Sequence, residues 1–74
     1  MSNTTITGYD PAVWRLSTFI GDWIYAVNGS RERGNHAQAV KRIRFLRNHL
    51  RDVPSPLRRD AIALYRIRKE QGNV

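Results

Sequence analysis

Positively charged side chains are the groups of this 74-residue chain best suited to chemistry with a partner. Twelve of its thirteen lysines and arginines follow Ser30. Residues 1–30 therefore carry a net charge of −1, and residues 31–74 carry a net charge of +8. A field of that sign attracts phosphate backbones and acidic protein surfaces, and it raises the rate of encounter with either.

Two of the expected helices place this charge around apolar side chains on their outer sides. We define the predicted basic face as Lys41, Arg42, Arg44, Phe45, Arg58, Arg59, Arg66 and Lys69. Guanidinium groups interleaved with an aromatic ring suit phosphate and base contacts, or a carboxylate-rich protein groove. A solvated charged surface is the ordinary alternative, but the excess of one sign favours a binding role.

A second candidate surface lies in the first third of the chain, on the side of an expected helix away from its apolar stripe. Its residues recur at spacings of four, three and four: Trp14, Thr18, Gly21 and Tyr25. Exposed Trp and Tyr are typical anchors of protein interfaces because they bury a large area at little rotamer cost. In the alternative interpretation, an N-terminal arm folds back through Ile6 and Tyr9 and covers the stripe as part of the core.

The chain has no constellation typical of an enzyme. It lacks a nucleophile with a neighbouring base, a phosphate-binding glycine loop and a plausible pair of catalytic carboxylates. His36 and His49 are thirteen residues apart, there is no cysteine, and this spacing is not that of a metal-ligand pair. We therefore expect a non-enzymatic protein with no cofactor, no metal and no small-molecule substrate.

Residues that start and stop helices predict where the elements lie. Asp10 and Pro11 open a first helix, which Asn28-Gly29 is expected to close. The polar segment 29–34 is bracketed by glycines and predicts an exposed loop. Asn35 is the expected cap of a second helix.

Pro54, Ser55 and Pro56 then end the second helix and begin a third, with Ser55 as the expected cap. The sequence predicts an all-α fold: a small three-helix domain over residues 10–72, preceded by an extended arm over residues 1–9. The helices are expected at about 11–27, 36–52 and 56–70. Apolar residues at helical spacing predict the core, which consists of Leu16, Ile20, Trp23, Ile43, Leu46, Leu50 and Leu64.

The second and third expected helices, with the short turn between them, also resemble a helix-turn-helix. In that arrangement the third helix would enter the major groove of DNA, presenting Ser55, Arg58, Arg59, Ile62 and Arg66. The turn holds two prolines instead of the usual glycine, and any three-helix bundle contains two consecutive helices. This alternative predicts a DNA-binding repressor.

The whole chain resembles the very small proteins with which lytic bacteriophages regulate the RNA polymerase of their host. These include regulators of Xanthomonas RNA polymerase that inhibit initiation and act as antiterminators. The resemblance rests on size, the absence of cysteine, an aromatic first helix with Trp14, Trp23 and Tyr25, and the basic run at 40–47. It implies a protein that docks on a polymerase subunit, weakens sigma-factor binding and places positive charge near the RNA exit channel.

The remaining sequence features concern location and a third class of function. Residues 1–5 lack the basic and then apolar run of a signal peptide, and no stretch approaches the roughly 20 apolar residues of a membrane span. We expect a soluble protein of the bacterial host's cytoplasm with no membrane partner. An inhibitor of a bacterial immunity complex would use the same basic face to block a nucleic-acid path.

Overall fold

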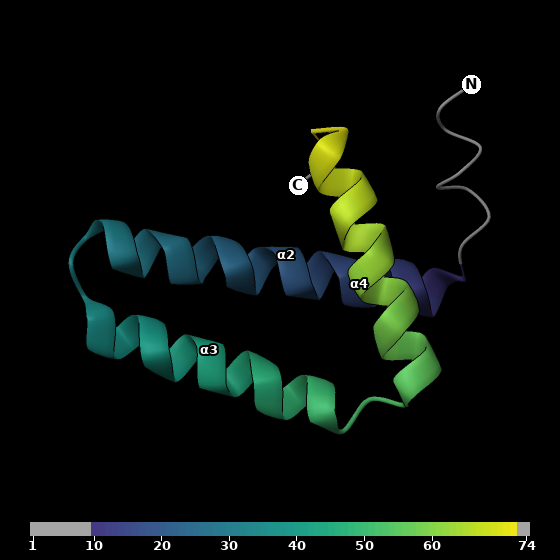
Figure 1. Cartoon of the computed structure of the whole chain (residues 1–74), viewed down its shortest axis with the longest axis horizontal. Coiled ribbons are helices and arrows are strands. Elements are labelled where there is room, and N and C mark those ends of the chain that lie inside the picture. The colour runs from purple at the N-terminus through teal and green to yellow at the C-terminus, as the bar shows by residue number, and fades with distance from the viewer. Residues whose placement is uncertain (1–9, 73–74) are drawn as a thin grey trace.

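The computed structural model describes residues 10–72 and confirms the predicted all-α class with three helices. Helix α2 spans Pro11–Glu32, α3 spans His36–Arg51 and α4 spans Ser55–Glu70. Helices α2 and α3 lie side by side as an antiparallel hairpin, and α4 crosses α2 (Figure 1). The predicted arm, residues 1–9, lies outside the described residues. None of the described helices combines the length and apolar character needed to cross a bilayer.

The start of α2 follows from its first two residues. The carboxylate of Asp10 accepts a hydrogen bond from the amide of Ala12 at 2.8 Å, and Pro11 occupies the first helical position. The carboxylate satisfies an amide that has no partner within the helix, and proline loses no bond there. The predicted opening of this helix is confirmed.

The predicted end of this helix is wrong, because α2 continues to Glu32 through the segment expected to form a loop at 29–34. Ser30 is completely buried; its hydroxyl donates to Oε1 of Gln38 at 2.8 Å and accepts from Nη1 of Arg42 at 3.0 Å. Both partners lie on α3. These contacts offset the roughly 1 kcal/mol that a glycine such as Gly29 costs inside a helix.

Gly34, not Gly29, ends the helix. It has a φ of 77°, in the left-handed region that glycine adopts without a steric penalty. Its amide donates to the carbonyl of Arg31 at 3.0 Å, and the amide of Asn35 donates to the carbonyl of Ser30 at 2.9 Å. This pair of bonds is a Schellman motif, which satisfies the last carbonyls of α2 and turns the chain into α3.

The next two helices begin in different ways. Asn35 caps α3 as predicted, because its side-chain oxygen accepts a bond from the amide of Gln38 at 3.1 Å. The predicted Ser55 cap of α4 is wrong: Pro54 occupies the capping position without a side-chain bond, and Ser55 is already helical. The Ser55 hydroxyl instead accepts a long bond of 3.4 Å from Arg58.

The core lies where α2 meets the other two helices. Its buried cluster consists of Val13, Ile20, Leu46, Ala61 and Leu64. Of the predicted core residues, Ile20, Leu46 and Leu64 are thus confirmed, whereas Leu16, Trp23 and Leu50 are partly buried against this cluster. Ile43 is half-buried and lines a surface hollow, so its prediction as a core residue is wrong.

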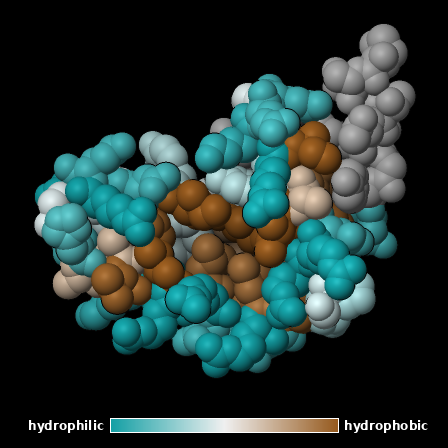
Figure 2. Space-filling view, in the orientation of Figure 1, coloured by the Kyte–Doolittle hydropathy of each residue, from teal (hydrophilic) through white to brown (hydrophobic). Residues whose placement is uncertain are grey.

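The three helices leave part of their apolar surface uncovered. In the view of Figure 1, hydrophobic residues form a band across the middle of the molecule, and hydrophilic residues border it (Figure 2). Helices α3 and α4 each pack on α2 and hardly contact each other. The central helix α2 therefore positions the outer surfaces of both.

Candidate nucleic-acid interface

Three arginines form hydrogen bonds to other parts of the fold, so their guanidinium groups are less available to a binding partner. Arg42 reaches across the hairpin, and its Nη1 donates to the carbonyl of Ala26 and to Oγ of Ser30, each at 3.0 Å. Nη1 of Arg58 donates to the carbonyl of Leu50 at 2.9 Å, at the C-terminal end of α3. Positive charge at a helix C-terminus is favourable because the last carbonyls lack helical partners.

The third such residue is Arg68, which joins α4 to α2. It is 8% exposed, and its Nη1 donates to Oγ of Ser17 at 2.8 Å and to Oγ1 of Thr18 at 2.7 Å. Its guanidinium carbon lies 4.1 Å from the centre of the Trp14 ring, which adds a cation–π contact. The buried Nε has no partner among the described residues. Thr18 belongs to the predicted aromatic stripe, whereas Arg68 and Ser17 were not predicted as functional residues.

This contact divides the predicted aromatic stripe. Trp14 and Thr18 face α4 through Arg68, and Gly21 is half-buried. Tyr25 remains 82% exposed. The first part of the stripe is therefore covered by α4, and Tyr25 is the member of the stripe that presents an open aromatic ring.

The predicted basic face also divides into internal and external members. Arg42 and Arg58 are tied to backbone carbonyls. The exposed members are Lys41, Arg44, Phe45, Arg59, Arg66 and Lys69. Because Arg58 is held at the end of α3, the helix-turn-helix alternative loses one of the arginines assigned to base contacts.

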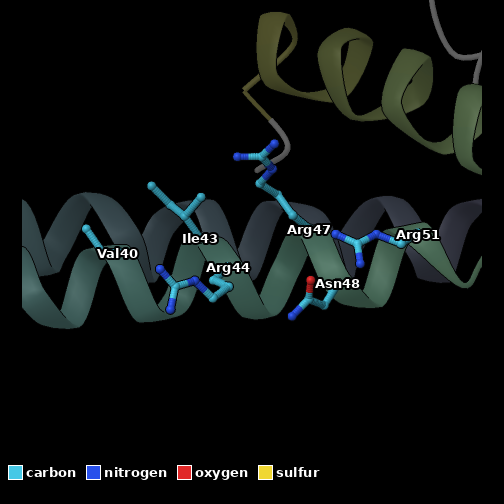
Figure 3. A pocket seen from close by; sticks show the side chains of 6 residues that line it. All are labelled: Val40, Ile43, Arg44, Arg47, Asn48 and Arg51. Atoms are coloured by element: carbon cyan, nitrogen blue, oxygen red, sulfur yellow. The ribbon is translucent and has the colours of Figure 1, made fainter.

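A coherent charged surface runs along the outer side of α3. We call it the arginine stripe: Val40, Ile43, Arg44, Arg47, Asn48 and Arg51. These six residues recur at helical spacing and line a hollow of about 440 Å³. Figure 3 shows Ile43 and Arg47 rising above the α3 ribbon, whereas Arg44 and Asn48 are drawn over the ribbon itself. The three arginine side chains of the stripe are all exposed.

Of the six residues of this stripe, only Arg44 was predicted from the sequence as a binding residue. Arg47 appears in the sequence as part of a basic run and Arg51 is not singled out, because Ile43 is assigned to the core and the helix is oriented accordingly. The spacing from Arg44 through Arg47 to Arg51 is three and then four residues, which places all three guanidinium groups on one side of a helix. That spacing was the available signal.

An aromatic cluster borders α3 on the side opposite the Ile43 edge. The ring centres of Trp23 and Phe45 are 4.7 Å apart, those of Phe19 and His49 are 4.5 Å apart, and those of Phe45 and His49 are 6.4 Å apart at 21°. These separations lie within or close to the range of favourable aromatic pairs. Phe45 nevertheless keeps 50% of its surface exposed.

The polar groups of the described residues form no cluster typical of metal binding. Within residues 10–72, no group of three or more His, Asp or Glu side chains is placed to hold a metal ion. His36 is exposed at the start of α3, and His49 lies in the aromatic cluster near its end. The surface therefore offers guanidinium groups and aromatic rings as its binding chemistry.

Comparisons with known proteins do not assign this surface. No protein-family model, no curated protein and no solved structure matches the chain.

Proposed function

We propose that this protein is a non-enzymatic regulator that binds the phosphate backbone of nucleic acid through the arginine stripe of α3. The single observation that carries the proposal is the alignment of Arg44, Arg47 and Arg51 on one exposed side of a helix. Guanidinium groups in a row match the repeating phosphates of a nucleic-acid strand, and each can bind two phosphate oxygens.

The net charge of the chain supports the proposal, although three of its arginines are used inside the fold. The bonds of Arg42, Arg58 and Arg68 go to carbonyl and hydroxyl oxygens. These three arginines act as structural links between helices, and the chain as a whole carries a net charge of +7. A surplus of this size in so small a domain favours association with a polyanion.

Salt dependence tests this function. We expect wild-type protein to bind oligonucleotides with an affinity that falls steeply as salt rises, because each phosphate contact releases counterions. Changing Arg44, Arg47 and Arg51 together to Gln is expected to lower the slope of log K against log salt by up to about three. Fluorescence anisotropy over a salt series measures both quantities.

A charge-matched triple variant separates a binding site from a general charge effect. Arg15, Arg59 and Arg66 are exposed and lie outside the stripe, so changing them to Gln removes the same charge. We expect this control to retain most of the affinity. Equal losses in both variants would contradict the proposal, and loss in the control alone would favour the helix-turn-helix alternative.

We propose further that the regulated process is transcription by bacterial RNA polymerase. The support is the resemblance to small phage regulators, together with the open ring of Tyr25, which is suited to a protein contact. Polymerase subunits are expected to remain with the protein in a pull-down from bacterial lysate after nuclease treatment. Tyr25→Ala is expected to weaken this retention, whereas the charge-matched control is not. Loss of all partners with nuclease would contradict the polymerase contact.

A further inference from the structure

We propose that the α3 surface prefers single-stranded to double-stranded nucleic acid, with the exposed ring of Phe45 as a stacking platform for an unpaired base. This inference rests on the proposed nucleic-acid function and names the form of its ligand. It is carried by the position of one half-exposed aromatic ring beside Lys41 and Arg44, at the edge of the arginine stripe.

The ring of Phe45 is held in place from the protein side. Trp23 packs at 4.7 Å and 35° to it, and His49 lies 6.4 Å away and nearly parallel at 21°. Half of its surface remains in solvent. A base that stacks on this ring loses little flexibility in the protein, because Trp23 and His49 already fix the ring.

The ring and the arginines share one helix. Phe45 directly follows Arg44 in α3, and Lys41 precedes Phe45 by four residues, which places Lys41 on the same side as the ring. A helix with its side chains is about 10–12 Å wide. A strand that crosses α3 therefore meets cationic groups and the aromatic ring within one helix width.

This combination distinguishes the two forms of nucleic acid. In a duplex the bases are stacked on one another, and proteins reach mainly their edges and the phosphates. In a single strand the base faces are free, and stacking on an aromatic side chain does not depend on sequence. We expect the arginine stripe to serve both forms and Phe45 to add affinity for the single strand alone.

The ordinary explanation is that Phe45 only fills space against Trp23. A leucine would fill much of that space while removing the aromatic face, so Phe45→Leu separates packing from stacking. Phe45→Tyr keeps the face and is the matched control. Ala63→Leu changes an exposed apolar residue of α4 that lies outside the arginine stripe, and it is the control for a general surface effect.

The test is fluorescence anisotropy with a labelled strand of about 12 nucleotides, as RNA, as DNA and as a DNA duplex of the same sequence. We expect wild type to bind the single strands more tightly than the duplex at equal salt. Phe45→Leu is expected to weaken single-strand binding by about 5- to 100-fold, which corresponds to one stacked base. Duplex binding is expected to change by less than about 2-fold, and Phe45→Tyr and Ala63→Leu are expected to behave as wild type.

The outcomes separate this inference from the function on which it rests. Unchanged single-strand binding by Phe45→Leu, or equal losses on both forms, would overturn the stacking role while leaving phosphate binding intact. A wild type that prefers duplex would also overturn it. If neither form binds, the proposed function and this inference both fail. A loss of fold in Phe45→Leu would show as a changed circular dichroism spectrum. Phe45→Met, which is also apolar and lacks an aromatic face, would then replace it in the same assays. A selective loss of single-strand binding by Phe45→Met supports the inference, and unchanged single-strand binding overturns it.

Discussion

At the scale of single residues, arginine has two different roles in this protein: some arginines link elements of the fold, and others are exposed to solvent. Arg42, Arg58 and Arg68 donate to oxygens of other elements, whereas Arg44 and Arg47 point into solvent. The difference follows from position: an arginine on the inward side of a helix can extend its apolar stem along the core and place its charged end on a polar group. Residue type alone does not separate the two roles.

Arg68 offers the clearest stability prediction at this scale. We expect Arg68→Ala to lower the free energy of unfolding by about 2 to 4 kcal/mol, because it removes two bonds to hydroxyls, the Trp14 contact and a buried stem. Urea unfolding followed by circular dichroism measures the change. Arg66→Ala, which alters an exposed arginine of the same helix, is expected to stay within about 0.5 kcal/mol. Equal unfolding midpoints for the two variants would show that Arg68 does not stabilise the fold.

At the scale of elements, some helix ends depend on residues next to them in the sequence, and others depend on contacts with another helix. The end of α2 depends on a tertiary network around Ser30 and on the conformation of Gly34. A methyl group added at Gly34 would meet no other atom within 4 Å, so space is not the constraint there. The constraint is the backbone angle.

Two glycine substitutions are therefore expected to have opposite effects. Gly34→Ala is expected to destabilise the protein by about 1 to 2 kcal/mol, because an L-residue is strained at a φ of 77°. Gly29→Ala is expected to be neutral or to stabilise by up to about 1 kcal/mol, because Gly29 is helical and the nearest atom is the flexible end of Arg33 at 3.3 Å. Thermal unfolding of both variants is the measurement. Two shifts of the same sign would contradict this account of the turn.

The same contrast explains how much could be predicted from the sequence. The three helices, the Asp10 cap and the Asn35 cap were predictable because their signals are local: capping side chains and apolar spacing. The continuation of α2 was not, because Gln38 and Arg42 stabilise it from another helix. For the site, the basic character of α3 was predictable, but the arginine stripe required the correct rotation of α3 about its axis.

The position of Arg68 along α4 indicates from the sequence alone that this residue lies on the inward side of the helix. The inward residues of α4 are Leu57, Ala61 and Leu64, and a further step of four residues reaches position 68. A charged residue on an apolar side indicates a buried polar partner. Its partners Ser17 and Thr18 could not be named from sequence, because they lie far away along the chain, at separations of 51 and 50 residues.

At the scale of the whole molecule, α2 is the common support. Both other helices pack on it and hardly on each other. A chain of this size buries a modest share of its surface, and several apolar residues remain half-covered. Stability must therefore depend strongly on the few side chains that are completely enclosed.

Leu64, which has no exposed surface, is the largest of these side chains. We expect Leu64→Ala to cost about 2 to 5 kcal/mol, a large part of the roughly 5 to 15 kcal/mol typical of a whole domain. Its unfolding midpoint in urea is expected to fall sharply, or the variant to be unfolded without denaturant. Val40→Ala removes methyl groups from an exposed position and is expected to stay near wild type. Similar midpoints for both variants would place Leu64 outside the core.

The bond between Arg68 and Ser17 has a consequence for the order in which the protein is made. The bond joins residues that are 51 positions apart in the sequence. Arg68 comes after Ala61 and Leu64 in the chain, and these two residues of α4 complete the core. During synthesis the chain emerges from its N-terminal side, so α2 and α3 are available well before α4. Until α4 emerges, the part of α2 that α4 covers faces water, and the described helices can form only the hairpin of α2 and α3. The nascent chain thus reaches its stable fold only when almost the whole described sequence has left the ribosome.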